Sequence, residues 1–123
     1  MVRVDITVSR RWIDDEVTMV GIRDALHASI VETFAVKPDD VEVRFYGMHK
    51  LNLNSGELAI EIIAGPGKNN SRIDDCRSML VQINRAIEKI VPKELRKKGK
   101  SNIWLLIGAK GSSMPIGCLE FIH

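Results

Sequence analysis

The feature that most constrains this chain is a pattern of strand, helix and strand that occurs twice along its 123 residues. Apolar and polar residues alternate over 2–8, 41–46 and 58–63, and this period of two is typical of half-buried β-strands. A fourth strand is expected at 103–107, where all five residues are apolar. The first two strands match the last two in order, which indicates a duplicated β-α-β unit.

Two segments between the predicted strands have the apolar spacing of amphipathic helices. The first is expected at about 15–34 and the second at about 73–91. Each begins at an Ile-Asp-Asp sequence, whose carboxylates stabilise the free backbone N–H groups and the positive end of a helix. Pro38 and Pro92 follow the two segments, as expected just beyond a helix C-terminus.

The duplicated unit predicts an α+β fold, in which a four-stranded mixed sheet has two helices on one face. No linker or low-complexity segment separates the halves, at about 1–56 and 57–123, so residues 1–123 are expected to form a single pseudo-symmetric domain. A ferredoxin-like βαββαβ fold has the same order of elements. Periodicity alone does not separate these two folds.

Some apolar surface in this pattern needs cover from elsewhere. The strand at 103–107 is apolar on both faces, so we expect it inside the sheet, covered on both sides by a helix, a sheet or a partner chain. Each half ends in a short alternating tail, with Leu51 and Leu53 in the first and Leu119 and Phe121 in the second. Such tails are unfavourable as exposed edges, and pairing with a neighbouring subunit is expected to cover them.

Composition argues against several classes of protein. Eighteen basic and sixteen acidic residues leave a net charge of +2, which is not the basic footprint of a nucleic-acid binder, and the basic run at 93–100 is interpreted as a solvated loop. No apolar run approaches the roughly 20 residues that cross a bilayer. Cys76 and Cys118 have no metal-ligand spacing, so no metal or other cofactor is expected, and they fit a reducing cytoplasm.

Four stretches carry a family resemblance through their order and spacing. They are VRVDI at 2–6, AVKPDDVEV at 35–43, IEIIAG at 60–65 and PIG at 115–117. The chain thereby resembles the tautomerase superfamily, which includes the macrophage migration inhibitory factor (MIF) proteins. The resemblance implies a homotrimer in which the short tails cross between subunits.

Members of that superfamily typically use an N-terminal proline as a general base, because an apolar pocket lowers the pKa of its secondary amine. Cationic side chains hold the enolate that forms. This sequence has Met1 and Val2 where the resemblance implies the proline. We therefore expect proton transfer to be absent or altered. The alternative is an active keto–enol tautomerase whose base is the primary α-amino group of Met1 or Val2.

The resemblance also assigns a binding site for small 2-oxo acids. Lys37 falls where MIF-like members keep a lysine at the pocket rim, and Arg10 and Arg11 lie near the place of a substrate-binding arginine, which can hold a carboxylate in a bidentate manner. Ile63 would be an apolar wall, and Ile103 stands in place of a pocket tyrosine. Structural interpretations compete at each position: an exposed turn lysine, exposed loop arginines and core isoleucines.

The polar faces of three strands carry charges of both signs, Arg3, Asp5, Glu42, Arg44 and Glu61. We expect them to point into the centre of an assembly and to form opposite-charge pairs between neighbouring strands. Three functions follow from the whole sequence. They are a cytoplasmic MIF-like homotrimer that binds small 2-oxo acids, an active tautomerase, and a non-enzymatic interaction module.

Overall fold

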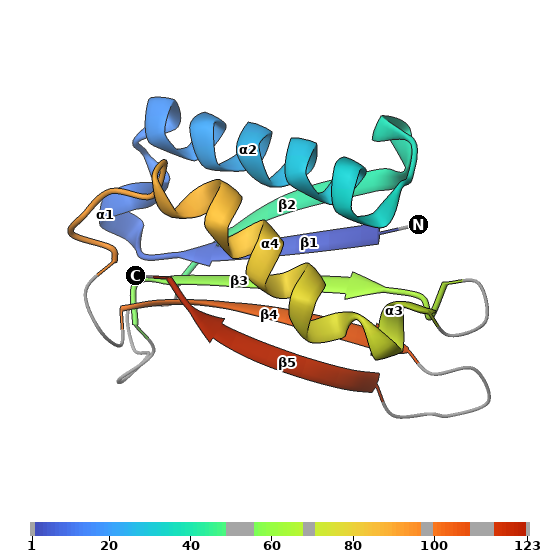
Figure 1. Ribbon diagram of the computed structural model, residues 1–123. Coiled ribbons are helices and arrows are strands. Elements are labelled where there is room, and N and C mark those ends of the chain that lie inside the picture. Colours follow the sequence, from blue (N-terminus) through green and yellow to red (C-terminus); the bar gives the residue numbers. More distant parts are fainter. Residues whose placement is uncertain (1, 49–55, 68–70, 97–99, 109–114, 123) are drawn as a thin grey trace.

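The fold has two layers, with a five-stranded sheet on one side and two long helices on the other (Figure 1). The computed structural model describes residues 2–48, 56–67, 71–96, 100–108 and 115–122. The strands are β1 (Val2–Val8), β2 (Val41–Gly47), β3 (Leu58–Ala64), β4 (Ser101–Gly108) and β5 (Pro115–Phe121). The helices are α1 (Arg10–Ile13), α2 (Glu16–Phe34), η1 (Pro38–Asp40), α3 (Ser71–Asp74) and α4 (Cys76–Glu88).

The strand order confirms the duplicated β-α-β unit. The sheet runs β2-β1-β3-β4-β5, and the two strands of each unit pair directly and in parallel, β1 with β2 and β3 with β4. The two units meet through the antiparallel pair of β1 and β3. In a ferredoxin-like split βαβ unit another strand lies between the two that the helix connects. The ferredoxin-like alternative is therefore wrong.

The sheet has five strands and not the four expected, because the tail of the second half pairs within its own chain. β5 is antiparallel to β4, with Leu105 opposite Cys118. The prediction that this tail pairs with a neighbouring subunit is wrong for the edge of β5 that faces β4. Along that edge the hydrogen-bonding partner is β4 of the same chain. The tail of the first half, with Leu51 and Leu53, lies outside the described residues.

Local capping sets the limits of the helices. Asp15 is the N-cap of α2, and its carboxylate accepts hydrogen bonds from the backbone N–H of Thr18 at 3.2 Å and from the Thr18 hydroxyl at 2.8 Å. α2 ends where Ala35 adopts a left-handed conformation with φ 52°. The second predicted helix is two helices, because the chain breaks at Asp75 between α3 and α4.

The core lies between α2, α4 and one face of the sheet. Alternate residues of the three central strands, β1, β3 and β4, point at the helices, and α2 and α4 supply the opposing side chains. The largest completely buried side chains are aliphatic: Ile6, Ile22, Leu26, Ile30, Leu58, Ile60, Ile62, Leu80, Ile83, Ile87, Leu95 and Ile103. Each such side chain contributes about 1.5–3 kcal/mol on burial, so this interface holds the two layers together.

The doubly apolar strand lies inside the sheet, between β3 and β5, as predicted. Its helix-facing side chains, Ile103, Leu105 and Ile107, are completely buried. On the other face Trp104 is 40% exposed. We call the sheet face that points away from the helices the open face. No described element of the chain covers this residue, so the expected second cover has to come from outside the described residues.

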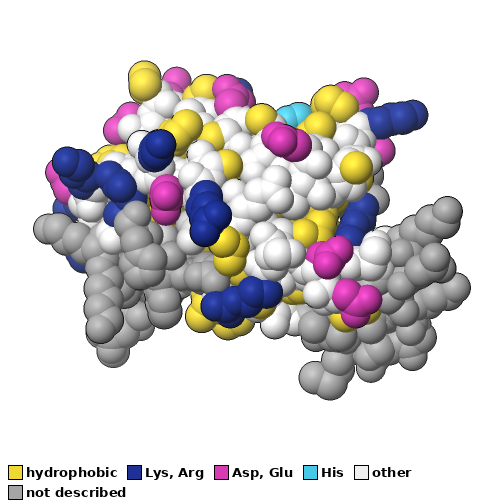
Figure 2. Space-filling model, viewed as in Figure 1, with side chains coloured by type: hydrophobic (Ala, Val, Ile, Leu, Met, Phe, Trp, Pro, Cys, Tyr) yellow, Lys and Arg dark blue, Asp and Glu magenta, His cyan; other side chains and the backbone are white. Residues whose placement is uncertain are grey.

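The side of the molecule that carries the helices has the surface of a solvated layer. Figure 2 shows Lys and Arg side chains interspersed with Asp and Glu side chains over this side, with no large area of one sign. Of the helices that the structure describes, none has the length and apolar composition needed to span a membrane.

The packing of α2 makes a direct prediction about stability. Ile22→Ala is expected to lower the free energy of unfolding by about 2–5 kcal/mol, because it leaves a cavity under the helix. Val17, in the same helix, is 87% exposed. Val17→Ala is therefore expected to change stability by less than about 0.5 kcal/mol. Urea unfolding followed by circular dichroism measures both changes, and equal effects would contradict the packing.

Candidate functional site

The sheet topology brings three of the predicted site positions to one end of the sheet. β1 and β2 are parallel, with Val2 opposite Val41, so both strands begin at this end. β3 runs the other way, and its residue Ile63 lies opposite Arg3. Figure 1 shows the N-terminus beside the end of β3. We call this region, which holds Val2, Lys37 and Ile63, the N-terminal end of the sheet.

Lys37 is held by an ordered turn. The residue precedes Pro38, and its backbone is extended at φ −72° and ψ 148°, as sterics before a proline require. Its carbonyl oxygen accepts a hydrogen bond from the N–H of Asp40 at 2.9 Å. The Lys37 side chain is exposed. The turn therefore holds the backbone in place and leaves the ammonium group accessible to an anion.

Apolar residues of β1 and β3 lie at this end of the sheet. Val2 is completely buried on the helix side, while Ile63 is partly buried on the open face, between Arg3 and Leu106 in register. Met1, the other predicted position of the amine, lies outside the described residues. This end of the sheet therefore holds an exposed ammonium group, that of Lys37, and a partly buried aliphatic side chain, that of Ile63.

Arg10 and Arg11 lie at the other end of β1. The seven residues of β1 separate them from Val2, a distance of roughly 20 Å at about 3.3 Å per residue. Arg10 is exposed and lines a surface cavity of about 390 Å³ with Ile13. The structure therefore does not bring either arginine together with Lys37 within one chain.

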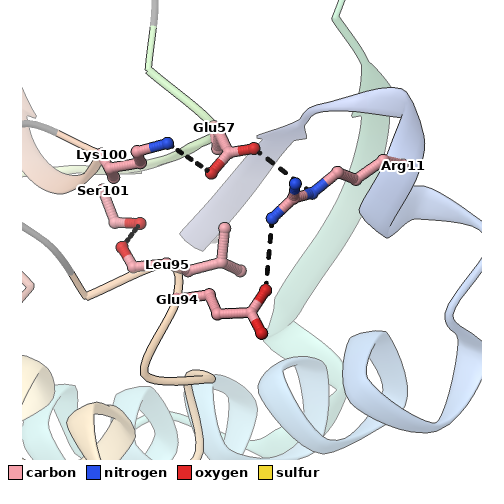
Figure 3. A network of polar contacts seen from close by, with 6 residues as sticks. All are labelled: Arg11, Glu57, Glu94, Leu95, Lys100 and Ser101. Atoms are coloured by element: carbon pink, nitrogen blue, oxygen red, sulfur yellow. Dashed lines mark hydrogen bonds and ion pairs between the residues drawn. The ribbon is translucent and has the colours of Figure 1, made fainter.

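Arg11 is engaged in a network of ion pairs (Figure 3). Its Nε lies 3.5 Å from Glu57 Oε1, and its Nη2 lies 3.3 Å from Glu94 Oε2. Glu57 also accepts from Lys100 Nζ at 3.3 Å. The Arg11 guanidinium lies 5.4 Å from the centre of the Trp12 ring. This network joins α1, the residue before β3 and the segment after α4, so it stabilises the fold at the end far from Lys37.

Ile103 lies in the core. Its side chain is completely buried on the helix-facing side of β4, next to Ile60 in register. The sequence predicts Ile103 either in the pocket or in the core, and within the single chain it is a core residue. The residue of β4 that lies beside Ile63 is Leu106.

Two cations at the N-terminal end were not among the predicted binding residues. Arg3 lies on the open face opposite Ile63, and its Nε is 3.3 Å from Asp5 Oδ2. Arg72, in α3, lies 5.1 Å from the centre of the Phe34 ring and lines a cavity of about 330 Å³ with Gly67. Strand alternation places Arg3 on this face, but the pairing register was needed to place it beside Ile63.

The open face carries a mixed array of charges over β1 and β2. The ion pairs run along the strands, Arg3 with Asp5 and Arg44 Nε with Glu42 Oε1 at 2.6 Å, and not between strands as expected. Register still sets Arg3 beside Glu42 and Asp5 beside Arg44. The hydrogen bond to Glu42 raises the pKa of Arg44 above its ordinary value, and Tyr46 acts in the same direction.

Within the residues that the structure describes, no three His, Cys, Asp or Glu side chains come together as the ligands of a metal ion would.

Comparisons with known proteins identify the fold. Pt0534 inactivated by 2-oxo-3-pentynoate matches with a TM-score of 0.60 and 13% identity, over 93% of this chain and 94% of that one. Leishmania major MIF2 matches with a TM-score of 0.55 and 14% identity, over 94% of this chain and 97% of that one. A fused 4-OT that forms a symmetric trimer matches with a TM-score of 0.55 and 12% identity, over 93% of this chain and 94% of that one.

These structures confirm the resemblance at the level of the fold: the chain has the tautomerase and MIF fold. No family model and no curated protein matches the sequence. At such low identity the likeness concerns the arrangement of the elements and not the chemistry of the site, which depends on this chain's own residues.

The ion-pair network makes a prediction that separates a structural role from a binding role. Glu57→Gln is expected to lower the free energy of unfolding by about 1 kcal/mol, because Arg11 and Lys100 lose a carboxylate whose side chain is only 17% exposed. The loss should shrink in 1 M salt, where charges are screened. Glu94→Gln, at a more exposed site, is the matched control and is expected to cost less than about 0.5 kcal/mol. A Glu57→Gln variant as stable as the parent at low salt would contradict this role.

Proposed function

We propose that the chain forms a homotrimer that binds small 2-oxo acids at the N-terminal end of the sheet, with proton transfer absent or altered. The observation that carries this proposal is that the turn at Lys37 and the residue Ile63 lie at the same end of the sheet as the start of β1, where positions 1 and 2 are Met and Val. The four prolines of the sequence are at positions 38, 66, 92 and 115. A cation and an apolar wall can bind the acid, but the secondary amine that the superfamily uses as a base is missing from these positions.

The ligand class is supported by charge and by a structural relative. An ammonium and a carboxylate about 4 Å apart attract by about 1 kcal/mol in water and by about 4 kcal/mol at an effective dielectric of 20. Ile63 and Leu106 would contact the apolar part of the acid. Pt0534, which has the same fold, is inactivated by 2-oxo-3-pentynoate, itself a 2-oxo acid. We infer the same class of ligand for this chain.

The trimer is supported by the open face. Trp104, Ile63 and Leu106 form its apolar part, and Trp104 is 40% exposed in the single chain. Two further subunits would cover this surface, and the fused 4-OT of similar fold is a symmetric trimer. Only a neighbouring subunit could bring Arg10 or Arg11 to Lys37, because the length of β1 separates them within one chain. We also infer a cytoplasmic location, since both cysteines are thiols.

Assembly through the open face predicts a change in mass. Light scattering of the parent protein is expected to give three times the 13.8 kDa of one chain. Trp104→Glu is expected to shift the mass towards a single chain, because it places a carboxylate beside Glu61, its register neighbour. Val17→Glu adds the same charge on α2 and should leave the mass unchanged. If the parent protein has the mass of one chain, the proposal of a trimer is wrong.

Binding at the N-terminal end predicts a role for one lysine. Isothermal titration with phenylpyruvate is expected to show binding that Lys37→Ala weakens about fivefold, because the loss of an exposed ion pair costs about 1 kcal/mol. Lys89→Ala, beyond the C-terminal end of α4, removes the same charge elsewhere and should leave the affinity unchanged.

The same samples test proton transfer. The ketonisation of enol phenylpyruvate is expected to proceed at the rate in buffer, because Met1 and Val2 stand where the superfamily has its proline and neither supplies a secondary amine. Binding without catalysis would agree with the proposal. A rate above buffer that is lost when the α-amino group is acetylated would instead favour the primary amine of Met1 or Val2 as a base. Neither binding nor catalysis would favour the interaction module.

A further inference from the structure

The fold brings together two cysteines that are 42 positions apart in the sequence. Cys76 is the first residue of α4, and Cys118 lies in β5 opposite Leu105, whose side chain points at the helices. The two Sγ atoms are 2.8 Å apart, and Cys76 Sγ is also 3.9 Å from the carbonyl oxygen of Leu105. Both cysteines are thiols. The contact is therefore between a helix terminus and the outermost strand of the sheet.

We propose that Cys76 and Cys118 are a modification site, which a small disulfide such as oxidised glutathione converts into an intramolecular disulfide that fastens β5 to α4. A disulfide needs an S–S separation of about 2.05 Å, so the two sulfurs have to approach by less than about 1 Å. Neither element has to leave its place in the fold for the bond to form. This inference shares no residue with the proposed ligand site, so either can fail without the other.

The burial of the two thiols sets the order of the reaction. Cys76 is only 6% exposed, whereas Cys118 is partly exposed and is the one that a soluble reagent reaches. The Cys118 thiolate attacks one sulfur of oxidised glutathione, and the S–S bond of the reagent breaks to release one glutathione thiol. The Cys76 thiolate then attacks the Cys118 sulfur of this mixed disulfide and displaces the second glutathione. The protein loses two hydrogens, and two electrons reduce one disulfide to two thiols.

The position of β5 gives the bond a consequence. Within the described chain β5 pairs with β4 along one edge only, and the chain beyond it is held by the hydrogen bond from Ile122 N to Ser101 O at 3.1 Å. A disulfide from α4 adds a second attachment for the strand. It also closes a long loop in the unfolded chain, which raises the melting temperature on the order of 10 °C for a domain of this size. In a reducing compartment the bond would be transient and would report an oxidising change.

The experiment uses the full chain, reduced, desalted and then incubated with oxidised glutathione. We expect an intact mass about 2 Da lower, one cross-linked pair of peptides that contains Cys76 and Cys118, and no covalent dimer on a non-reducing gel. The melting temperature should rise by about 10 °C and return on addition of dithiothreitol. Two thiols that both remain alkylatable after this treatment, or a bond only between chains, would overturn the proposal.

Two matched variants test the order of attack. Cys76→Ser is expected to retain glutathione on Cys118, because the second thiol that displaces it is missing. Cys118→Ser should take up glutathione far more slowly, because Cys76 is buried. Equal modification of both variants would overturn the assignment of Cys118 as the first thiol. Alkylation of the parent chain decides whether the bond forms even if a variant folds poorly.

Discussion

The antiparallel pairing of β1 with β3 is the interaction on which the rest of this structure depends. Each β-α-β unit is local in sequence, but this pair joins the two units into one sheet. Its register also decides which chain segments meet. Because Arg3 lies opposite Ile63, the starts of β1 and β2 lie at the same end as the ends of β3 and β4. The position of Lys37 and Ile63 at one end of the sheet follows from this pairing.

The two faces of the sheet differ in chemistry: one is an aliphatic face packed on the helices, and the other is the partly charged, partly apolar open face. The helix-facing side chains are aliphatic and completely buried, so they contribute the hydrophobic free energy of the fold. The open face is charged over β1 and β2 and apolar over part of β3 and β4. Its exposed Trp104 is the kind of surface that a further copy of the chain would cover, whereas the charged part stays favourable in water.

The candidate site depends on which cations are accessible. Lys37 is exposed at the N-terminal end of the sheet, whereas Arg11 is paired with Glu57 and Glu94 at the other end. A fold shared with tautomerases at 12–14% identity does not transfer their chemistry, because activity depends on single side chains such as a proline before the first strand.

Alternation and capping are local properties, so the sequence by itself determined the first three strands to within a residue, β1 from Val2 to Val8 among them, and the start of α2 after Asp15. It also determined that the strand at 103–107 lies inside the sheet, because a strand apolar on both faces is unfavourable at an exposed edge. Only the tertiary structure decided that β5 pairs with its own chain, that Arg10 and Arg11 lie far from Lys37, and that Cys76 contacts Cys118. These depend on which segments distant in the chain lie side by side; alternation sets the face on which a side chain lies, but not the strand that becomes its neighbour.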